Sequence, residues 1–276
     1  MDFKNFSDGN NNNMMRLEER YKRIVTSNLD AFLGKTVLDI AANNGRWTYA
    51  ALDAGASHVT SIEGREARAA DAVHFLDDLG YSGKYTANVG DMYDFLYETR
   101  NQHFDTVLCL GIYYHVMDHY HFLKQIARHS PTTIIIDSGF VRSFRSSVHV
   151  QYEDPSLHLN ALSVFAGQKN EPVGFVSLGL MIQMAWNLGY NCRPILWDPN
   201  DVTHKSSVQD YMSGRRFTVR LDKIDGNYDA DWRDYWASAL IAVNKKFALL
   251  MNKETHDQAT DTRAQGRVET AVFTIF

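Results

Sequence analysis

Short strand-like runs that alternate with helical segments are the feature that most constrains the fold of this chain. Five β-branched apolar runs follow one another from residue 36, and stretches with helical periodicity separate them. The predicted strands are Thr36–Ile40, His58–Glu63, Tyr85–Val89, Thr106–Leu110 and Thr132–Asp137. The helices between them are predicted at about Trp47–Ala54, Ala67–Leu79, Tyr93–Thr99 and His119–His129. Strands that alternate with helices form βαβ units, so we predict a parallel sheet with helices on both faces.

The end of this sheet is predicted to be antiparallel. A helix is expected around Ser177–Leu188, and two further strands are expected at Asn191–Trp197 and Arg215–Leu221. Fewer than twenty residues and no helix join these two strands, and such a connection favours antiparallel pairing. The predicted fold class is therefore α/β, a doubly wound, Rossmann-like sheet of seven mostly parallel strands with an antiparallel last strand.

Three segments fall outside the repeat of strands and helices. Residues 1–29 begin with a polar, asparagine-rich run and continue as a helix-like stretch, which we interpret as a mobile segment and a lid helix. Residues 30–225 form the predicted main domain, and its residues 140–176 show no strand repeat and are expected to cover the binding crevice. Residues 226–276 hold an amphipathic helix and a loose tail, and this helix suits either docking on the domain or a homodimer contact.

The composition disfavours several classes of protein. The 276 residues carry a net charge of −5, which disfavours a broad surface for nucleic acid. Cys109 and Cys192 lie in strand-like apolar runs, which indicates buried thiols in an intracellular protein. No apolar run is long enough to span a membrane, and the N-terminus lacks the apolar region of a signal peptide. We therefore expect a soluble, cytoplasmic protein without a membrane partner, and nucleic acid is disfavoured as a partner.

The turn after the first predicted strand, AANNG at residues 41–45, has one glycine, Gly45. Ala41 is small, and asparagine, found at Asn43, is among the residues that most readily accept a positive φ. A dinucleotide pyrophosphate needs the backbone of the turn to approach it closely, and the side chains of alanine and asparagine hinder that approach. The turn therefore favours a nucleoside cofactor without a phosphate.

Acidic residues follow the next two predicted strands. Glu63 ends the second strand, where a carboxylate accepts hydrogen bonds from ribose hydroxyls. Asp91 comes just after the third strand, in NVGDMYD, where a carboxylate can accept a hydrogen bond from the amine of adenine. This order of residues predicts a site for ribose and adenine.

These segments resemble the class I S-adenosylmethionine-dependent methyltransferase family. VLDIAANNGRW is similar to its first motif, VTSIEGR to the acidic end of its second strand, and NVGDMY to its adenine-proximal segment. FDTVLCLGIYYHVMDHYHFLKQIA resembles its fourth-strand motif, in the branch that includes wobble-uridine carboxymethyltransferases and small-molecule methyltransferases. The resemblance covers roughly residues 30–222, and it departs at Ala41 and Asn43, where glycines are usual.

The resemblance implies S-adenosylmethionine as the cofactor and a set of residues that bind it. Asp39 would lie near the methionine amine, and Leu110 and Gly111 would line the methionine side. The full set of cofactor-binding residues implied in this way is Asp39, Ala41, Asn43, Gly45, Glu63, Asp91, Met92, Leu110 and Gly111.

His115 and Asp137 are the candidate catalytic residues. Methyl transfer from a sulfonium depends on alignment, and an acceptor hydroxyl or ammonium must also lose a proton to a base. His115 follows the fourth predicted strand, at the edge where an open parallel sheet has its crevice. The alternative for His115 is a helix cap or a packing contact with the cofactor. For Asp137, which ends the fifth strand, the alternative is a capping or loop-bonding carboxylate.

Aromatic and basic residues near these candidates are predicted to bind the acceptor. An arginine could hold an anionic group of the acceptor by a bidentate contact, although a solvated charge is the alternative. The predicted substrate-binding residues are Tyr113, Tyr114, Arg142, Arg145 and His149. No metal site is predicted, because His119 and His121 are two positions apart and would point to different faces of a helix.

The predicted function is transfer of a methyl group from S-adenosylmethionine to an oxygen or nitrogen of a small molecule. One alternative is a tRNA-modifying methyl- or carboxymethyltransferase, and another is a non-catalytic scaffold that binds a nucleotide cofactor. A nicotinamide-dependent dehydrogenase is disfavoured by the missing glycines and by the antiparallel last strand. The sequence leaves the acceptor and the oligomeric state open.

Overall fold

The computed structural model describes residues 11–225 apart from 144, 158, 164–166, 196 and 198–199. The predicted C-terminal helix, with its dimer contact, and the first ten residues lie outside the described residues. In chain order the elements are α1 (Asn11–Ile24), η2 (Thr26–Ala31), β1 (Thr36–Ile40), α2 (Arg46–Asp53), β2 (His58–Glu63), α3 (Glu66–Asp78), β3 (Tyr85–Val89), α4 (Met92–Glu98), β4 (Thr106–Leu110), η3 (Tyr113–His115), α5 (His119–Ala127), β5 (Thr133–Gly139), β6 (Val148–Glu153), β7 (Glu171–Val176), α6 (Leu178–Asn187), β8 (Tyr190–Ile195), η4 (Lys205–Val208), α7 (Gln209–Met212) and β9 (Arg216–Lys223).

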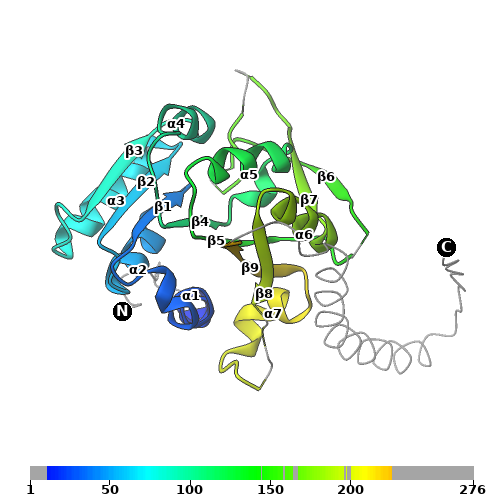
Figure 1. Ribbon diagram of the computed structural model, residues 1–276, viewed down its shortest axis with the longest axis horizontal. Helices are drawn as coiled ribbons and strands as arrows, with labels where there is room; N and C mark the ends of the chain where they lie inside the picture. Colours follow the sequence, from blue (N-terminus) through cyan, green and yellow to red (C-terminus); the bar gives the residue numbers. More distant parts are fainter. Residues whose placement is uncertain are drawn as a thin grey trace, which may run out of the picture. The chain divides into compact units, whose positions relative to one another are not determined.

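Seven of these strands form one sheet in the order β3-β2-β1-β4-β5-β9-β8 (Figure 1). The pairs among β1 to β5 are parallel, whereas β9 runs antiparallel to both of its neighbours, β5 and β8. The predicted fold class is thus confirmed, and the first four strands have the predicted bounds. The fifth strand extends two residues further than predicted, to Gly139, because it pairs with Arg216 at the start of β9.

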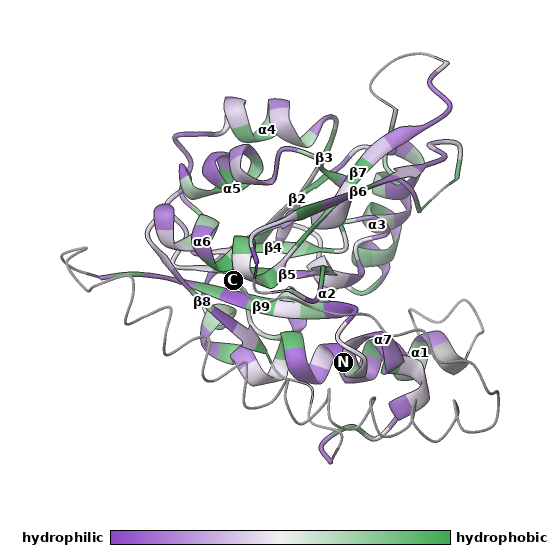
Figure 2. Ribbon diagram, turned by 90° about the vertical axis from the view of Figure 1, so that its right-hand side faces the viewer, coloured by the Kyte–Doolittle hydropathy of each residue, from purple (hydrophilic) through white to green (hydrophobic). Residues whose placement is uncertain are grey.

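Helices lie on both sides of the sheet (Figures 1 and 2). The helices α1, α2 and α3 pack against one face through a buried cluster that includes Leu17, Trp47 and Leu76 together with Val37 and Leu108 of the strands. The central strands β4 and β5 are buried along almost their whole length, and they are largely apolar. A parallel strand covered on both faces requires this composition, which explains why both strands could be predicted from their apolar runs.

The segment from residue 140 to residue 176 contains two strands that the sequence did not predict. Strands β6 and β7 form a separate antiparallel pair beside the main sheet (Figure 2). The imidazole Nε2 of His119 lies 2.9 Å from the carbonyl oxygen of Gly174, so α5 is tied to β7. A Cβ at Gly174 would lie 2.6 Å from the His119 ring, so this close approach requires glycine. Most of β6 is exposed, and it therefore lacks the apolar run by which the buried strands were predicted.

The turn between β1 and α2 has three residues in the left-handed region. The φ angles are +59° at Ala41, +52° at Asn43 and +76° at Gly45, so the predicted positive φ of Asn43 is confirmed. A Cβ at Gly45 would lie 2.8 Å from the Cβ of Ala72 on α3, so glycine is required there for space as well as for conformation. Ala41, by contrast, adopts its conformation at a cost in free energy.

This strain predicts that Ala41→Gly raises the free energy of unfolding by about 0.5–1 kcal/mol, since relief of a left-handed alanine outweighs the added entropy of the unfolded chain. Ala42→Gly is the matched control, because Ala42 has no positive φ and its side chain is buried. This control should lower the stability. Urea denaturation of both variants measures the effect, and a loss of stability in Ala41→Gly equal to that in Ala42→Gly would contradict the prediction.

Candidate active site

A cavity of about 730 Å³ opens at the carboxyl ends of the parallel strands, and α1 and the segment before β7 contribute to its wall. The predicted residues that line it are Ala41, Asn43, Glu63, Asp91, Met92, Leu110, Gly111, Tyr114 and His115. The predicted residues outside its lining are Asp39, Gly45, Tyr113, Asp137, Arg142, Arg145 and His149. The structure therefore brings together most of the implied cofactor residues with one candidate base.

Glu63 lies at the end of β2 with its carboxylate beside the turn. Its Oε2 accepts a hydrogen bond from the backbone N–H of Asn43 at 2.8 Å, and its Oε1 accepts one from the N–H of Arg65 at 2.9 Å. A carboxylate has about four acceptor positions, so roughly half of them remain for a ligand. The two bonds fix the carboxylate in a position from which it can accept hydrogen bonds from a diol.

Asp91 combines a structural role with a place in the cavity wall. Its Oδ1 caps α4 by accepting hydrogen bonds from the N–H groups of Tyr93 at 2.7 Å and Asp94 at 3.2 Å. Its Oδ2 has no partner among the described residues, which leaves an acceptor for a ligand amine. Asp91 therefore caps α4 with one carboxylate oxygen and leaves the other available.

Asp39 is not among the residues that line the cavity. Its side chain is buried behind the turn, and its Oδ2 accepts a hydrogen bond of 2.8 Å from the hydroxyl of Thr48. Burial raises the pKa of Asp39 to about 7, and the nearby charge of Glu63 adds to this effect. Asp39 therefore joins β1 to α2.

His115 is held by a carboxylate that the sequence analysis missed. Its Nδ1 lies 2.7 Å from Oε2 of Glu153, at the end of β6, and this oxygen also accepts a hydrogen bond from the N–H of Ala161. Because an ionised carboxylate only accepts, Nδ1 carries the hydrogen and the lone pair of the neutral ring lies on Nε2. Burial lowers the pKa of His115, although Glu153 opposes the shift. The ring is therefore neutral near pH 7 and can accept a proton.

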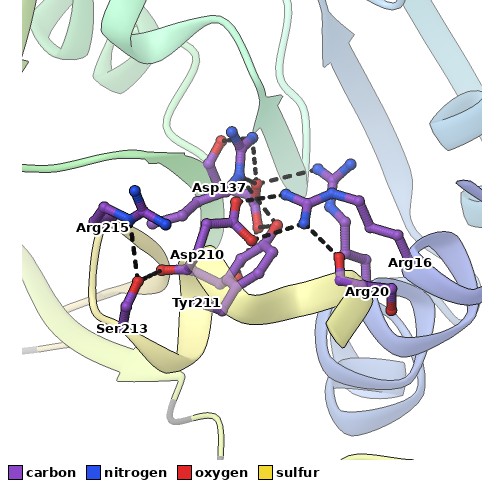
Figure 3. Close-up of polar contacts among 10 residues, drawn as sticks. Arg16, Arg20, Asp137, Asp210, Tyr211, Ser213 and Arg215 are labelled. Carbon is purple, nitrogen blue, oxygen red and sulfur yellow. Dashed lines mark hydrogen bonds and ion pairs between the residues drawn. The ribbon is translucent and has the colours of Figure 1, made fainter. Parts of the chain in front are cut away.

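Asp137 is enclosed by donors and does not line the cavity (Figure 3). Its carboxylate accepts hydrogen bonds from Arg20 (3.1 Å), Arg216 (2.7 Å), Tyr211 (2.7 Å) and Thr218 (2.8 Å). Burial alone would raise the pKa of Asp137, but these arginines and hydroxyls outweigh it and lower the pKa to about 2. A fully buried carboxylate with so low a pKa is a poor base, so this arrangement argues against the predicted catalytic role and corresponds to the loop-bonding alternative.

The predicted acceptor residues divide between the cavity and the rest of the domain. Tyr114 lines the cavity, stacks on Phe175 of β7 at 5.5 Å between ring centroids, and lies next to the guanidinium of Arg216. Tyr113 is fully buried against His119, Phe122 and Phe140. Arg142 donates to the carbonyl of Ser213, whereas Arg145 and His149 are exposed away from the cavity. Three arginines that were not predicted line the cavity near Asp137, namely Arg16, Arg20 and Arg216.

A sequence signal existed for some of the missed residues. Arg16 and Arg20 are one helical turn apart on α1, so they lie on the same face of that helix. Arg216 and Glu153 offered no local signal, since each meets its partner across a large separation in sequence.

The described residues lack two features, a metal-binding cluster and a membrane-spanning helix. They contain no group of three or more His, Cys, Asp or Glu side chains arranged to hold a metal ion. In the same residues, no helix combines the length and the apolar character needed to cross a membrane.

Comparison with known proteins identifies a methyltransferase domain within the chain. The model of a family described as a methyltransferase domain matches residues 37–131, which run from β1 to just before β5. The chain contains a class I methyltransferase domain. The family match and the fold confirm the predicted enzyme class and its cofactor, S-adenosylmethionine. No curated protein has a significantly similar sequence.

Solved methyltransferase structures share the fold at low sequence identity. The N-terminal domain of EvdMO1, crystallised in the presence of SAH and D-fucose, has a TM-score of 0.58 and 20% identity over 75% of this chain and 83% of that chain. The match to the longer EvdMO1 chain covers 41% of that chain. Magnesium protoporphyrin IX methyltransferase (ChlM) from Synechocystis PCC 6803, with bound SAH, has a TM-score of 0.52 and 13% identity over 80% of this chain and 91% of that chain.

The ion cluster around Asp137 predicts that Asp137→Asn lowers the free energy of unfolding by about 3–5 kcal/mol, because two buried guanidinium groups lose their counter-ion. The folded-state pKa lies below the ordinary value of 3.8, so the stabilisation is complete above that pH and is lost as the pH falls towards about 2. Denaturation curves at several pH values measure both effects. The difference between wild type and variant should shrink in acid, and an exposed control, Asp78→Asn, should leave the melting temperature almost unchanged.

Proposed function

We propose that this methyltransferase transfers a methyl group to a hydroxyl oxygen of a small molecule, with His115 as the base that takes the proton. The observation that carries the proposal is the bond between His115 and Glu153. It fixes the ring at the cavity wall and leaves Nε2 without a partner among the described residues.

The cavity has the groups that S-adenosylmethionine needs. Glu63 would accept hydrogen bonds from the ribose, and Oδ2 of Asp91 would accept one from the adenine amine. Ala41, Asn43 and Gly111 would line the methionine side, as the family resemblance implies. The cofactor supplies a methyl group on a positively charged sulfur, which a nucleophile can displace directly.

A neutral histidine at the wall favours oxygen over nitrogen as the acceptor atom. A neutral amine can attack with its own lone pair, whereas a hydroxyl is a weak nucleophile until it loses its proton. His115 can take that proton at Nε2, and Glu153 stabilises the positive charge that the ring then carries. Tyr114, stacked on Phe175, provides a flat wall beside this position for an apolar part of the acceptor.

The volume of the cavity and the net charge of the protein favour a small-molecule acceptor over tRNA. The cavity of about 730 Å³ lies within the range usual for small-molecule sites. The net charge of −5 does not favour the broad phosphate contacts that bind RNA.

Calorimetric titration with S-adenosylhomocysteine tests the cofactor part of the proposal. We expect binding that Glu63→Ala weakens by about 10–100-fold, since ribose hydroxyls lose a charged acceptor. The control is Glu66→Ala, because Glu66 is exposed on α3 and does not line the cavity, and it should bind as the wild type does. NADH should not bind. Equal affinity in Glu63→Ala and Glu66→Ala would remove the assigned adenosine site.

The pH dependence of turnover tests the base, once screening of hydroxyl compounds has given an acceptor. His115→Ala should lower kcat by about 10²–10⁴-fold. In the wild type, kcat/KM should fall as the pH drops through the pKa of His115, at a pH below the usual value of 6.5. Glu153→Gln should lower kcat and move this acidic limb to still lower pH, because the charged ring loses its carboxylate partner.

The control for these variants is His58→Ala, at the opposite end of the sheet, where β2 begins. It should change neither kcat nor the pH profile. An acidic limb that stays in place in Glu153→Gln would show that His115 is not the titrating base.

A further inference from the structure

Three arginines and two carboxylates meet at the wall of the cavity near the ends of β5 and β9 (Figure 3). Arg16 forms a bidentate pair with Asp210 on α7, with N–O distances of 2.7 and 2.6 Å. Arg20 and Arg216 share the remaining carboxylate, that of Asp137. The cluster therefore carries one more positive charge than negative charge.

Arg20 and Arg216, which share Asp137, each have N–H groups that make no hydrogen bond with the described residues. Both approach Oδ1 of Asp137, Arg20 through Nη2 and Arg216 through Nε and Nη2. The Nη1 group of each has no partner among the described residues, and the buried Nε of Arg20 also lacks one. Both side chains line the cavity, and they are only 11% and 15% exposed.

A guanidinium held in so little water needs a counter-ion. Charged groups that are nearly buried occur with partners, because their lost hydration is not otherwise replaced. The other groups at the cluster, Tyr211, Thr218 and the carbonyl of Ser207, are neutral. Among the described residues, the cluster therefore lacks one negative charge.

We propose that the acceptor carries an anionic group, a carboxylate or a phosphate, which binds the Nη1 groups of Arg20 and Arg216. The inference rests on the proposed function and narrows its substrate class. Arg216 lies 5.7 Å from the ring centroid of Tyr114, the neighbour of His115, so the anion would lie on the side of the cavity that holds the base. Glu63 and Asp91 follow β2 and β3, towards the opposite edge of the sheet. The planar fork of arginine suits both anionic groups.

The carboxylate of the cofactor is a second source of the same chemistry, and 5′-methylthioadenosine separates the two. This nucleoside keeps the adenosine and the sulfur but lacks the amino acid. Inorganic phosphate serves as the probe and is titrated calorimetrically into the full chain saturated with S-adenosylhomocysteine, and in parallel with 5′-methylthioadenosine. If the anion belongs to the acceptor, phosphate binds both complexes with similar affinity.

Substitutions of the two arginines test whether these residues bind the phosphate. Arg20→Gln and Arg216→Gln should each weaken phosphate binding by about tenfold or more, because each removes a charge-assisted hydrogen bond. Arg215→Gln is the matched control, since Arg215 is adjacent, exposed and outside the cavity lining, and it should bind phosphate as the wild type does. If Arg216→Gln does not fold, Arg216→Lys keeps the charge and should show an intermediate loss.

Three results would overturn the proposal. These are phosphate binding to the methylthioadenosine complex alone, phosphate binding to neither complex, and equal phosphate affinity in Arg20→Gln, Arg216→Gln and Arg215→Gln. The first would assign the arginines to the carboxylate of the cofactor. A failure of the proposed function is distinct, because it would appear as an absence of S-adenosylhomocysteine binding or as an acidic limb that Glu153→Gln leaves in place, and neither result depends on phosphate.

Discussion

The buried carboxylate of Asp137 joins parts of the chain that are distant in sequence. It lies near the end of β5 and accepts hydrogen bonds from Arg20 on α1, Tyr211 on α7, and Arg216 and Thr218 on β9. These contacts fix α1 and the start of β9 at the carboxyl edge of the sheet, where they form one wall of the cavity. A buried ion pair is weak evidence for stability, because desolvation offsets attraction. Its consequence here is geometric: the wall beside His115 has a defined shape and a positive charge.

The opposite wall is built by the turn after β1 and by the acid at the end of β2. Positive φ angles at Ala41 and Asn43 give the turn a shape in which the N–H of Asn43 meets the carboxylate of Glu63. That contact orients the Glu63 carboxylate, a hydrogen-bond acceptor, towards the cavity. The turn lacks the glycine-rich sequence that binds a pyrophosphate. The wall at β5 and β9 therefore carries the guanidinium groups of Arg20 and Arg216, whereas the wall at β2 and β3 carries the fixed carboxylates of Glu63 and Asp91. A cofactor with hydroxyls and an acceptor with an anion would match this division.

Much of the fold could be predicted from the sequence because the central strands are buried on both faces. The β-branched runs predicted β1 to β4 with the observed bounds. The short connection predicted the antiparallel β9, although that connection contains η4 and α7, which were not expected. The hairpin of β6 and β7 was missed because β6 is mostly exposed and has no apolar run. In the site, Glu63 could be predicted because it ends a strand, and His115 could be predicted because it follows one. The partners of His115 and Asp137 could not, since Glu153 is 38 residues from the first and Arg20 is 117 residues from the second.

A crystal structure of the protein with bound S-adenosylhomocysteine tests the account most directly. The account predicts that the ribose lies on Glu63, that the adenine amine lies within hydrogen-bonding distance of Asp91, and that the sulfur faces the space between His115 and Tyr114. It also predicts that Nη1 of Arg216 stays free of the cofactor. An adenosine bound elsewhere, or a sulfur turned away from His115, would contradict the central claim that this cavity aligns a hydroxyl for methyl transfer.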